Sequence, residues 1–498
     1  SYNVVTNVLQ NELHFKGLIF TDALNMKGAT NFKQPGDIDL EAFKAGNDIL
    51  LFAENVPLAL EKICVAIQDT VISEKRLEQS VKNILRYKYL AGLNNYKPVE
   101  IPYIYDDLNN ADAQALQYQL YENAVTVLKN ENEILPIKDV ANEKIAYVKL
   151  GDDTNTSFLN TLRQYTEVTE VSNDSLHLLI DDLKKYTTVI IGYHKADGAW
   201  KKHDFTVDEL VKIQEIAKNN KVILDIFTKP YSLIPINSFS DIEGLVVSYQ
   251  NSDVAQNVSG QLIFGAIDAK GKLPVSIGTT FKVNDGLKTK KLNRLGFTAA
   301  ENVGMSSKAL ARIDLIANNA IERQMTPGIQ VLVARKGKVV FQKSYGYHDY
   351  KNEVKVKNSD IYDVASLTKI VSTLPDVMQL YDQKKFTLDT RLGTMLPAFE
   401  NTDKKNITFK ELLSHYARLQ PWIPFYQATL NADKKPSDKY YKNTLTPEFS
   451  LQVAENLFLR NDYKDTIIKK IAESKLLPKK EYKYSDFTFI ILKEYLEK

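Results

Sequence analysis

The stretch Ile145-Ala146-Tyr147-Val148-Lys149-Leu150 is short and apolar, with the length and composition of a buried β-strand. Three runs of the same kind follow, with helical patterns between them, at residues 189–193, 222–227 and 245–249. Thr206 and Glu209 mark the start of one of these helices, because their spacing is that of a capping box. Alternating apolar strands and helices are typical of a doubly wound sheet, so we predict an α/β sandwich with a mostly parallel sheet over residues 96–280.

Strand and helix patterns also alternate in residues 1–95. An apolar run ends at Asp22, a helical pattern with Phe43 follows, and a second apolar run occupies residues 48–52. This order predicts parallel βα units. A closed (β/α)8 barrel needs about 250 residues and eight strands, so we interpret this segment as the C-terminal part of a barrel whose earlier strands lie upstream of Ser1.

The remaining residues form two further segments. Residues 281–302 mix Gly, Thr, Lys and Asn without apolar periodicity, and we predict that they link the sandwich to a domain at residues 303–498. A β-hairpin is expected near the start of this domain, where apolar runs flank a turn at residues 335–338 that contains Gly337.

Composition limits the classes of function. The chain has 498 residues, 44% of them hydrophobic and 25% charged, as in an ordinary globular protein of roughly three domains. The formal net charge is +2, and residues of one charge sign form no long run in the sequence, so no nucleic-acid partner is expected. The apolar runs are far shorter than the roughly 20 residues of a membrane span, and none is expected. The single cysteine, Cys64, lies in an apolar run and is expected to be buried.

The segment Asp363-Val364-Ala365-Ser366-Leu367-Thr368-Lys369 places Ser366 and Lys369 three residues apart. On a helix this spacing brings two side chains to the same face, about 5 to 6 Å apart. A serine hydroxyl is a weak nucleophile that needs a neighbouring base, and a lysine whose pKa is lowered by burial can serve. The spacing also occurs by chance on solvated helices, so the motif alone leaves both interpretations open. Pro375 is expected to end or kink this helix.

A second polar motif, Tyr484-Ser485-Asp486, lies just before an apolar helix. Together with the hairpin and the segments at 388–389 and 412–415, it makes residues 303–498 resemble the class C β-lactamase and D-alanyl-D-alanine peptidase superfamily of serine hydrolases. The resemblance implies Ser366 as the acylated nucleophile, Lys369 as its proton partner and Tyr484 as a second acid/base.

Two departures from this family are expected to matter. Asp486 stands at a substrate-binding position where the family usually has Asn. The family's third motif, a strand with Lys- or His-x-Gly, is expected beyond Lys498, so we expect a partial domain that acylates poorly. His415, in the segment 412–415, is expected to pack or hydrogen-bond structurally.

Asp22 occupies the C-terminal end of an apolar parallel strand, where barrel enzymes place reactive groups, although a carboxylate there can equally cap a turn. The string from Lys16 to Met26, with the segments 45–50, 122–131 and 271–275, resembles glycoside hydrolase family 3, most closely its β-N-acetylglucosaminidase branch. The resemblance implies that Asp22 attacks the anomeric carbon with retention of configuration and that Met26 binds substrate.

In that branch the acid/base is a His-Asp pair on an earlier barrel loop, which is expected upstream of Ser1. The pair His203-Asp204 lies downstream in a polar stretch and is expected to be a solvated loop. The other histidines show no spacing typical of metal ligands, and no metal or other cofactor is expected.

These inferences combine into one prediction of fold. The fold class is α/β: the end of a TIM barrel at residues 1–95, the sandwich at 96–280, a linker at 281–302 and a partial β-lactamase-like α+β domain at 303–498.

The predicted protein is a bacterial, periplasmic or cell-envelope enzyme, seen here as an internal fragment that lacks full activity. One centre removes β-linked N-acetylglucosamine from peptidoglycan or chitooligosaccharides, and a Ser-x-x-Lys centre hydrolyses acyl or peptide substrates. Two alternatives stay open: a serine β-lactamase, esterase or peptidase with a non-catalytic family 3 scaffold, or a cell-wall-binding module with degenerate sites.

Overall fold

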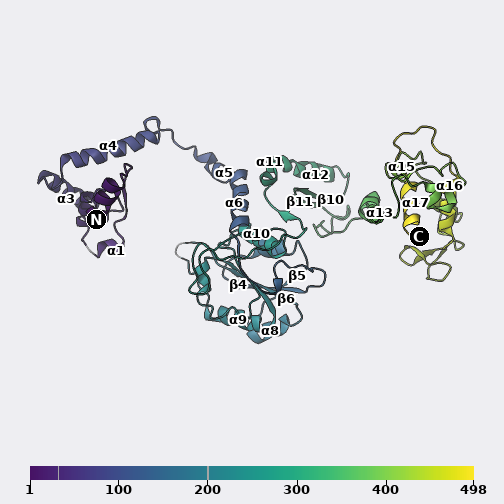
Figure 1. The fold of residues 1–498 in the computed structure, drawn as a ribbon, viewed down its shortest axis with the longest axis horizontal. Helices are drawn as coiled ribbons and strands as arrows, with labels where there is room; N and C mark the ends of the chain where they lie inside the picture. The colour runs from purple at the N-terminus through teal and green to yellow at the C-terminus, as the bar shows by residue number, and fades with distance from the viewer. Residues whose placement is uncertain (32, 199–200, 498) are drawn as a thin grey trace. The chain divides into compact units, whose positions relative to one another are not determined.

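The computed structural model describes residues 1–31, 33–198 and 201–497. It divides into two compact units, residues 1–356 and 357–498, which are described separately here (Figure 1). Helices and strands alternate, and the largest sheet is mostly parallel, which confirms the predicted α/β class. Within the described ranges, no helix is long and apolar enough to cross a membrane.

Residues 1–95 hold a two-stranded parallel sheet of β1 (Phe20–Ala23) and β2 (Ile49–Leu51), as predicted. The helices of this segment are a π-helix at Asn3–Glu12, α1 (Lys27–Thr30), α2 (Asp37–Lys44), α3 (Val56–Gln68) and α4 (Glu74–Leu90). The prediction that Cys64 is buried is wrong, because Cys64 lies on the exposed face of α3. Ala66 and Ile67 of the same helix face the small core instead.

The six-stranded sheet lies at the centre of the sandwich. Its strands run in the order β3-β8-β7-β6-β4-β5, and β3 pairs antiparallel with β8 while the other pairs are parallel. The strands are β3 (Thr126–Asn130), β4 (Ile145–Gly151), β5 (Val168–Glu170), β6 (Thr188–His194), β7 (Lys221–Phe227) and β8 (Gly244–Val247). The surrounding helices are α5 (Ile104–Leu108), α6 (Ala111–Ala124), α7 (Thr156–Leu162), α8 (Leu176–Leu183), α9 (Val207–Asn219) and α10 (Asp253–Ile263).

Helices cover both faces of this sheet. Val189 and Ile191 of β6 pack on one side in a core with residues of α8 and α9, whereas Ile190 packs on the other side with α7 and α10 (Figure 1). Every residue of β6 is buried, as expected for a parallel strand enclosed on two sides. The predicted capping box of Thr206 and Glu209 begins α9.

A second, three-stranded sheet follows in the same unit. Its strands are β9 (Gly296–Phe297), β10 (Gly328–Arg335) and β11 (Lys338–Gly346). Two helices, α11 (Ser307–Leu310) and α12 (Arg312–Glu322), lie between β9 and β10 in the sequence. β10 and β11 form the predicted antiparallel hairpin, and Lys336 and Gly337 in its turn both have positive φ, 53° and 74°. Before it, Arg294 in the segment 281–302 donates to the carbonyls of Ile137 and Phe264 at 2.6 and 2.7 Å. This segment therefore packs along the sandwich.

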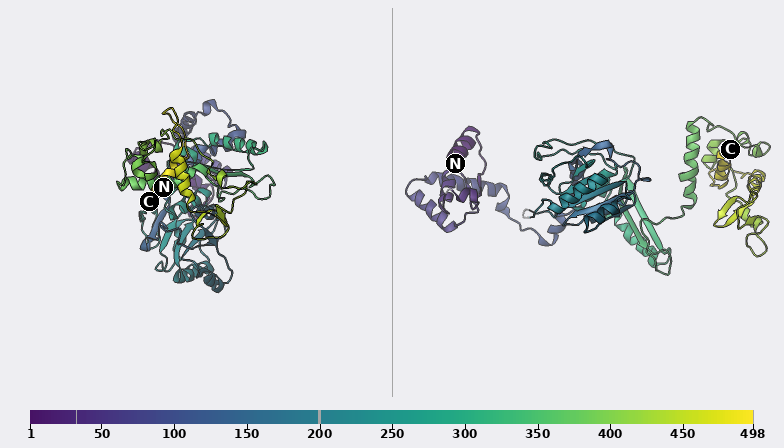
Figure 2. Two further views of the ribbon diagram at one scale, coloured as in Figure 1. Left: turned by 90° about the vertical axis from the view of Figure 1, so that its right-hand side faces the viewer. Right: turned by 90° about the horizontal axis from the view of Figure 1, so that it is seen from below.

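The unit at residues 357–498 is mainly helical. Its helices are α13 (Leu374–Asp382), α14 (Leu392–Met395), α15 (Phe409–Leu413), α16 (Tyr463–Glu473) and α17 (Phe487–Leu496), the last drawn in yellow in Figure 2. A small antiparallel sheet contains β12 (Tyr441–Lys442), β14 (Leu457–Leu459) and β13 (Leu451–Ala454), in that order. Phe487 and Ile491 of α17 are fully buried in the core of this unit, together with Phe409 of α15.

The carboxyl group of Asp225 on β7 is fully buried in the interior of the sandwich. Ser248 donates a hydrogen bond to one of its oxygens at 2.8 Å, and Ser259 of α10 donates to the other. Burial raises the pKa of Asp225 to about 7, and the two serine hydrogen bonds only partly oppose this rise. The folded protein therefore holds a proton here that the unfolded chain releases near pH 4.

This difference predicts a pH-dependent stability. Between about pH 4 and pH 7 the folded state binds more protons than the unfolded state at this site, so the free energy of unfolding falls as the pH rises through that window. An Asp225→Asn substitution keeps a neutral hydrogen-bonding side chain and should flatten this slope. Differential scanning calorimetry of the full chain at several pH values tests it, with the exposed Asp182→Asn as control. An unchanged slope in Asp225→Asn contradicts the assignment.

Candidate active site

Ser366 lies in a 3-10 turn, Ala365–Leu367, which leads directly into a π-helical turn, Lys369–Thr373. Asp363 accepts the backbone N–H of Ala365 at 2.6 Å, and Ala365 has a φ of 45°, so the chain turns sharply just before the serine. Lys369 Nζ donates to Ser366 Oγ at 3.1 Å. The predicted pairing of these two side chains is therefore present, although the backbone between them is not a regular α-helix.

Pro375 lies in the first turn of α13, which begins at Leu374 directly after the π-helical turn. The backbone stays helical at the junction, where Thr373 has φ and ψ of −63° and −41°. A proline is tolerated in a first turn, because its missing N–H has no partner there. Pro375 therefore marks a change of helical winding and does not end the helical segment that carries Ser366.

Tyr484 reaches Ser366 from a segment 118 positions further along the chain. Its hydroxyl donates to Ser366 Oγ at 3.1 Å. The serine oxygen thus lies within hydrogen-bond distance of an ammonium and a phenol, the two groups that could exchange a proton with it.

Asp486 binds Lys369 as a counter-ion, with 3.0 Å between Oδ1 and Nζ. Lys369 Nζ also lies 5.5 Å from the ring centroid of Tyr484 and 6.0 Å from that of Phe489. Burial lowers the pKa of Lys369, but hydrogen bonds to Tyr484 and Asp486 and the charge of Asp486 outweigh burial, and the net pKa is raised. The expectation of a lysine with a lowered pKa is therefore wrong, because Tyr484 and the carboxylate of Asp486 both favour the charged ammonium.

The ring of His415 packs against the ring of Tyr484. Its ring centroid lies 4.7 Å from that of Tyr484, and its Nδ1 accepts the N–H of Ser485 at 3.3 Å. The His415 backbone, at a φ of 59°, accepts the N–H of Lys483 at 2.9 Å. These contacts confirm that His415 packs and hydrogen-bonds. Its position near Ser366 and Lys369 could not be derived from sequence spacing, since it depends on how residues 482–486 pack against His415.

Asp22 is exposed on β1, near the carboxyl end of the strand. Its Oδ1 accepts the adjacent N–H of Ala23 at 2.7 Å, and Thr21 beside it accepts the N–H of Leu51, tying the ends of β1 and β2 together. Met26 follows just before α1 and is 45% exposed. The catalytic role of Asp22 and the binding role of Met26 stay predictions.

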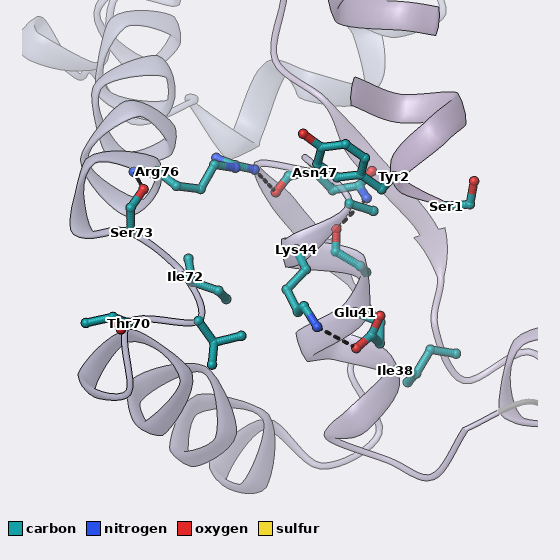
Figure 3. Close-up of a pocket in the computed structure, with 13 residues that line it drawn as sticks. Ser1, Tyr2, Ile38, Glu41, Lys44, Asn47, Thr70, Ile72, Ser73 and Arg76 are labelled. Carbon is teal, nitrogen blue, oxygen red and sulfur yellow. Dashed lines mark hydrogen bonds and ion pairs between the residues drawn. The ribbon is translucent and has the colours of Figure 1, made fainter. Parts of the chain in front are cut away.

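A cavity of about 930 Å³ in the same segment does not include Asp22 among its lining residues (Figure 3). It is bounded by α2 and by the loop between α3 and α4, on the side where Asn47 precedes β2. Its charged groups are already paired: Lys44 with Glu41 at 3.1 Å and Arg76 with Asp48 at 3.5 Å. Ligands of parallel sheets bind at the carboxyl ends of strands, so this cavity is not a candidate for the glycosidase centre.

His203 is buried, which shows that the prediction of a solvated loop at His203-Asp204 is wrong for the histidine. Its Nδ1 is 2.8 Å from the hydroxyl of Thr228, and Tyr193 donates to its carbonyl at 3.2 Å. These bonds make it a structural residue, while Asp204 stays exposed. Among the residues that the structure describes, no group of three or more His, Cys, Asp and Glu side chains could hold a metal ion.

Comparison with protein families identifies the two ends of the chain. The model of the family described as "Glycosyl hydrolase family 3 N terminal domain" matches residues 1–87, and the "Beta-lactamase" model matches residues 317–498. The chain therefore joins a glycoside hydrolase family 3 segment to a β-lactamase domain, which confirms both resemblances.

Individual relatives match parts of the chain. A putative beta-xylosidase of Formosa agariphila is 23% identical over 316 residues, covering 55% of this chain and 41% of the relative. Beta-hexosaminidase A of Pseudoalteromonas piscicida is 23% identical over 302 residues, covering 57% and 44%. Protein flp of Staphylococcus aureus is 26% identical over 137 residues, 27% of each chain. The matched part of this chain thus spans less than half the length of these relatives.

Among solved structures, similarity is found to a glycoside hydrolase family 3 beta-N-acetylglucosaminidase from Paenibacillus sp. str. FPU-7. The identity is 20% and the TM-score 0.44, over 56% of this chain and 55% of the other. Beta-glucoside phosphorylase BglX is 18% identical with a TM-score of 0.48, over 56% and 53%.

The geometry predicts an electrostatic link between His415 and Lys369. Burial lowers the pKa of His415, and the charge of Lys369 lowers it further. Replacing Lys369 by Met removes that charge, so His415 should titrate at a higher pH. Nuclear magnetic resonance of the histidine Cε1 group, with the exposed Lys410→Met variant as control, measures this shift. An unaltered His415 titration in Lys369→Met shows that the two groups are not coupled.

Proposed function

We propose that this protein has two hydrolytic centres, a serine acyl hydrolase at Ser366 and a glycosidase at Asp22. The observation that carries the proposal is the convergence of Lys369 Nζ and Tyr484 OH on Ser366 Oγ, each at 3.1 Å. The family 3 match over residues 1–87 supports the glycosidase, and the relative named beta-hexosaminidase A supports an N-acetylated amino sugar as its substrate.

At the serine centre, Ser366 attacks the carbonyl carbon of an ester, amide or β-lactam. The O–H bond of the serine breaks, its oxygen bonds to carbon, and the proton passes to Lys369 Nζ or the Tyr484 oxygen once one of them has released its own proton. The same group then returns the proton to the leaving atom. Water hydrolyses the acyl-enzyme by the reverse proton path.

At the glycosidase centre, Asp22 is the nucleophile. An exposed carboxylate at a strand end can reach the anomeric carbon of a bound β-glycoside. The new bond to the Asp22 oxygen forms as the glycosidic bond breaks and the aglycone leaves with a proton from the acid expected on an earlier barrel loop. Water then displaces Asp22 from the glycosyl-enzyme, so that hydrolysis retains the configuration. Met26, which lies just beyond it at the start of α1, would contact the sugar.

Peptidoglycan is the substrate that both centres can share. Its glycan contains β-linked N-acetylglucosamine, and its peptide stems contain amide bonds for a serine acyl hydrolase. This substrate places the protein in the periplasm or cell envelope. Digestion of muropeptides that releases neither N-acetylglucosamine nor peptide fragments would rule out the shared substrate.

A second candidate is a serine esterase, peptidase or β-lactamase whose family 3 portion is a scaffold. The contacts around Ser366 favour it, because four polar side chains from two distant segments, residues 366–369 and 484–486, meet there. The two candidates differ in one respect, whether Asp22 forms a covalent bond to sugar.

The serine centre is tested by covalent labelling. A fluorophosphonate or fluorescent penicillin probe should label the wild type slowly, in line with the expected poor acylation, and Ser366→Ala should abolish labelling because no attacking oxygen remains. Tyr484→Phe should slow labelling by about 100-fold, as expected for the loss of a general acid/base. The exposed Ser414→Ala is the matched control. Labelling that survives in Ser366→Ala contradicts the proposal.

The glycosidase centre is tested with a fluorinated dinitrophenyl β-N-acetylglucosaminide, whose leaving group departs without protonation. Asp22 should become glycosylated, which mass spectrometry of the peptide containing Asp22 detects. Asp22→Ala should lose the adduct, and Asp69→Asn, an exposed position between α3 and α4, should keep it. An adduct on another residue, or none on the wild type, leaves the scaffold candidate in place.

A further inference from the structure

The Asp486 carboxylate is directed toward Lys369. Asp486 precedes α17, but its own φ and ψ of −67° and −23° are helical, unlike the extended backbone of a capping aspartate, and its side chain makes no capping bond to the helix. It lies instead 3.0 Å from Lys369 Nζ, with its side chain 46% exposed and that of Lys369 20% exposed.

The backbone holds Asp486 independently of its side chain. The N–H of Asp486 donates to the carbonyl of Pro421 at 2.9 Å. On either side, Ser485 is almost fully buried and Phe487 completely so. The position of the carboxylate is therefore set by its neighbours, and a substitution at Asp486 should leave the fold of the segment intact.

Three titratable groups face Lys369 from the surrounding elements. They are Asp486 before α17, the phenol of Tyr484, and the half-buried imidazole of His415 after α15. Phe489 adds an aromatic face at 6.0 Å. Of these groups only the Asp486 carboxylate carries a full negative charge, so it supplies the counter-charge that keeps Lys369 an ammonium.

We propose that Asp486 is a positioning residue, which holds the Lys369 ammonium against Ser366 and sets the pH above which Lys369 can accept the serine proton. The proposal rests on the proposed serine hydrolase function. It assigns to Asp486 a role on the lysine, separate from any contact with substrate.

The consequence is a serine whose reactivity increases with pH. While Asp486 is ionised, Lys369 carries its full set of protons, donates to Ser366 Oγ and cannot act as the base. An Asp486→Asn variant keeps the size of the side chain and a hydrogen-bonding oxygen but loses the charge. Burial, which lowers the pKa of Lys369, is then opposed by Tyr484 alone, so the pKa falls relative to the wild type and neutral amine appears at a lower pH.

The experiment measures the second-order rate of Ser366 labelling by a fluorophosphonate between pH 5 and pH 11, on the full chain. The rising limb of the profile should move at least about one pH unit lower in Asp486→Asn, which is about a tenfold gain in rate near pH 7. Asp486→Glu restores the charge and should return the limb toward that of the wild type. The exposed Asp438→Asn should match the wild type.

A second readout does not depend on acylation. Reductive ¹³C-methylation of lysines, with Lys369→Arg to assign the signal, reports the titration of Lys369 by nuclear magnetic resonance in wild type and Asp486→Asn. A lower midpoint in Asp486→Asn supports the ion pair even if the wild type resists labelling, an outcome that would defeat the proposed function alone. An unchanged midpoint, or a rate that drops equally at every pH, overturns the proposal.

Discussion

The placement of Tyr484 and Asp486 beside Ser366 and Lys369 depends on the burial of two neighbouring residues, Ser485 and Phe487. Ser485 donates to the carbonyl of Gln420 at 2.6 Å and accepts the N–H of Phe487, which is itself fully buried. Because Ser485 and Phe487 point inward, the alternate residues Tyr484 and Asp486 face Ser366 and Lys369. The positions of Tyr484 and Asp486 are thus determined by the packing of α17 in the core.

This packing explains why the site could be predicted only in part. The pairing of Ser366 with Lys369 depends on a separation of three residues and was predictable from local helical geometry. The approach of Tyr484 is a tertiary contact, and it entered the prediction through the family resemblance alone. The ion pair of Asp486 with Lys369 was not predicted, since it requires both the burial of Phe487 and the choice of Asp at a position that the family usually fills with Asn. Together with the hydrogen bond to Tyr484, the Asp486 carboxylate raises the pKa of Lys369, which is the opposite of the expected direction.

The fold shows the same division between local and tertiary signals. Long apolar runs identified the strands β4, β6 and β7, and the spacing of Thr206 and Glu209 identified the start of α9. β3 was not predicted, because it is an antiparallel edge strand whose pairing with β8 leaves no periodic trace in the sequence. Cys64 and His203 were misplaced for a related reason: an apolar or polar neighbourhood along the chain does not determine which face of a helix, or which loop side chain, turns inward.

The two strand-end aspartates of the N-terminal segment differ in how far their carboxylates are engaged by the fold. Asp48, at the start of β2, accepts the N–H of Ile19 at 3.2 Å and a hydrogen bond from Ser80, and it pairs with Arg76 at 3.5 Å. These bonds join β1, β2 and α4, so the charge of Asp48 is used within the fold. Asp22, toward the other end of β1, is exposed and accepts the N–H of its own neighbour. A carboxylate must be accessible to attack an anomeric carbon, and of these two only Asp22 is exposed, which is consistent with its proposed role.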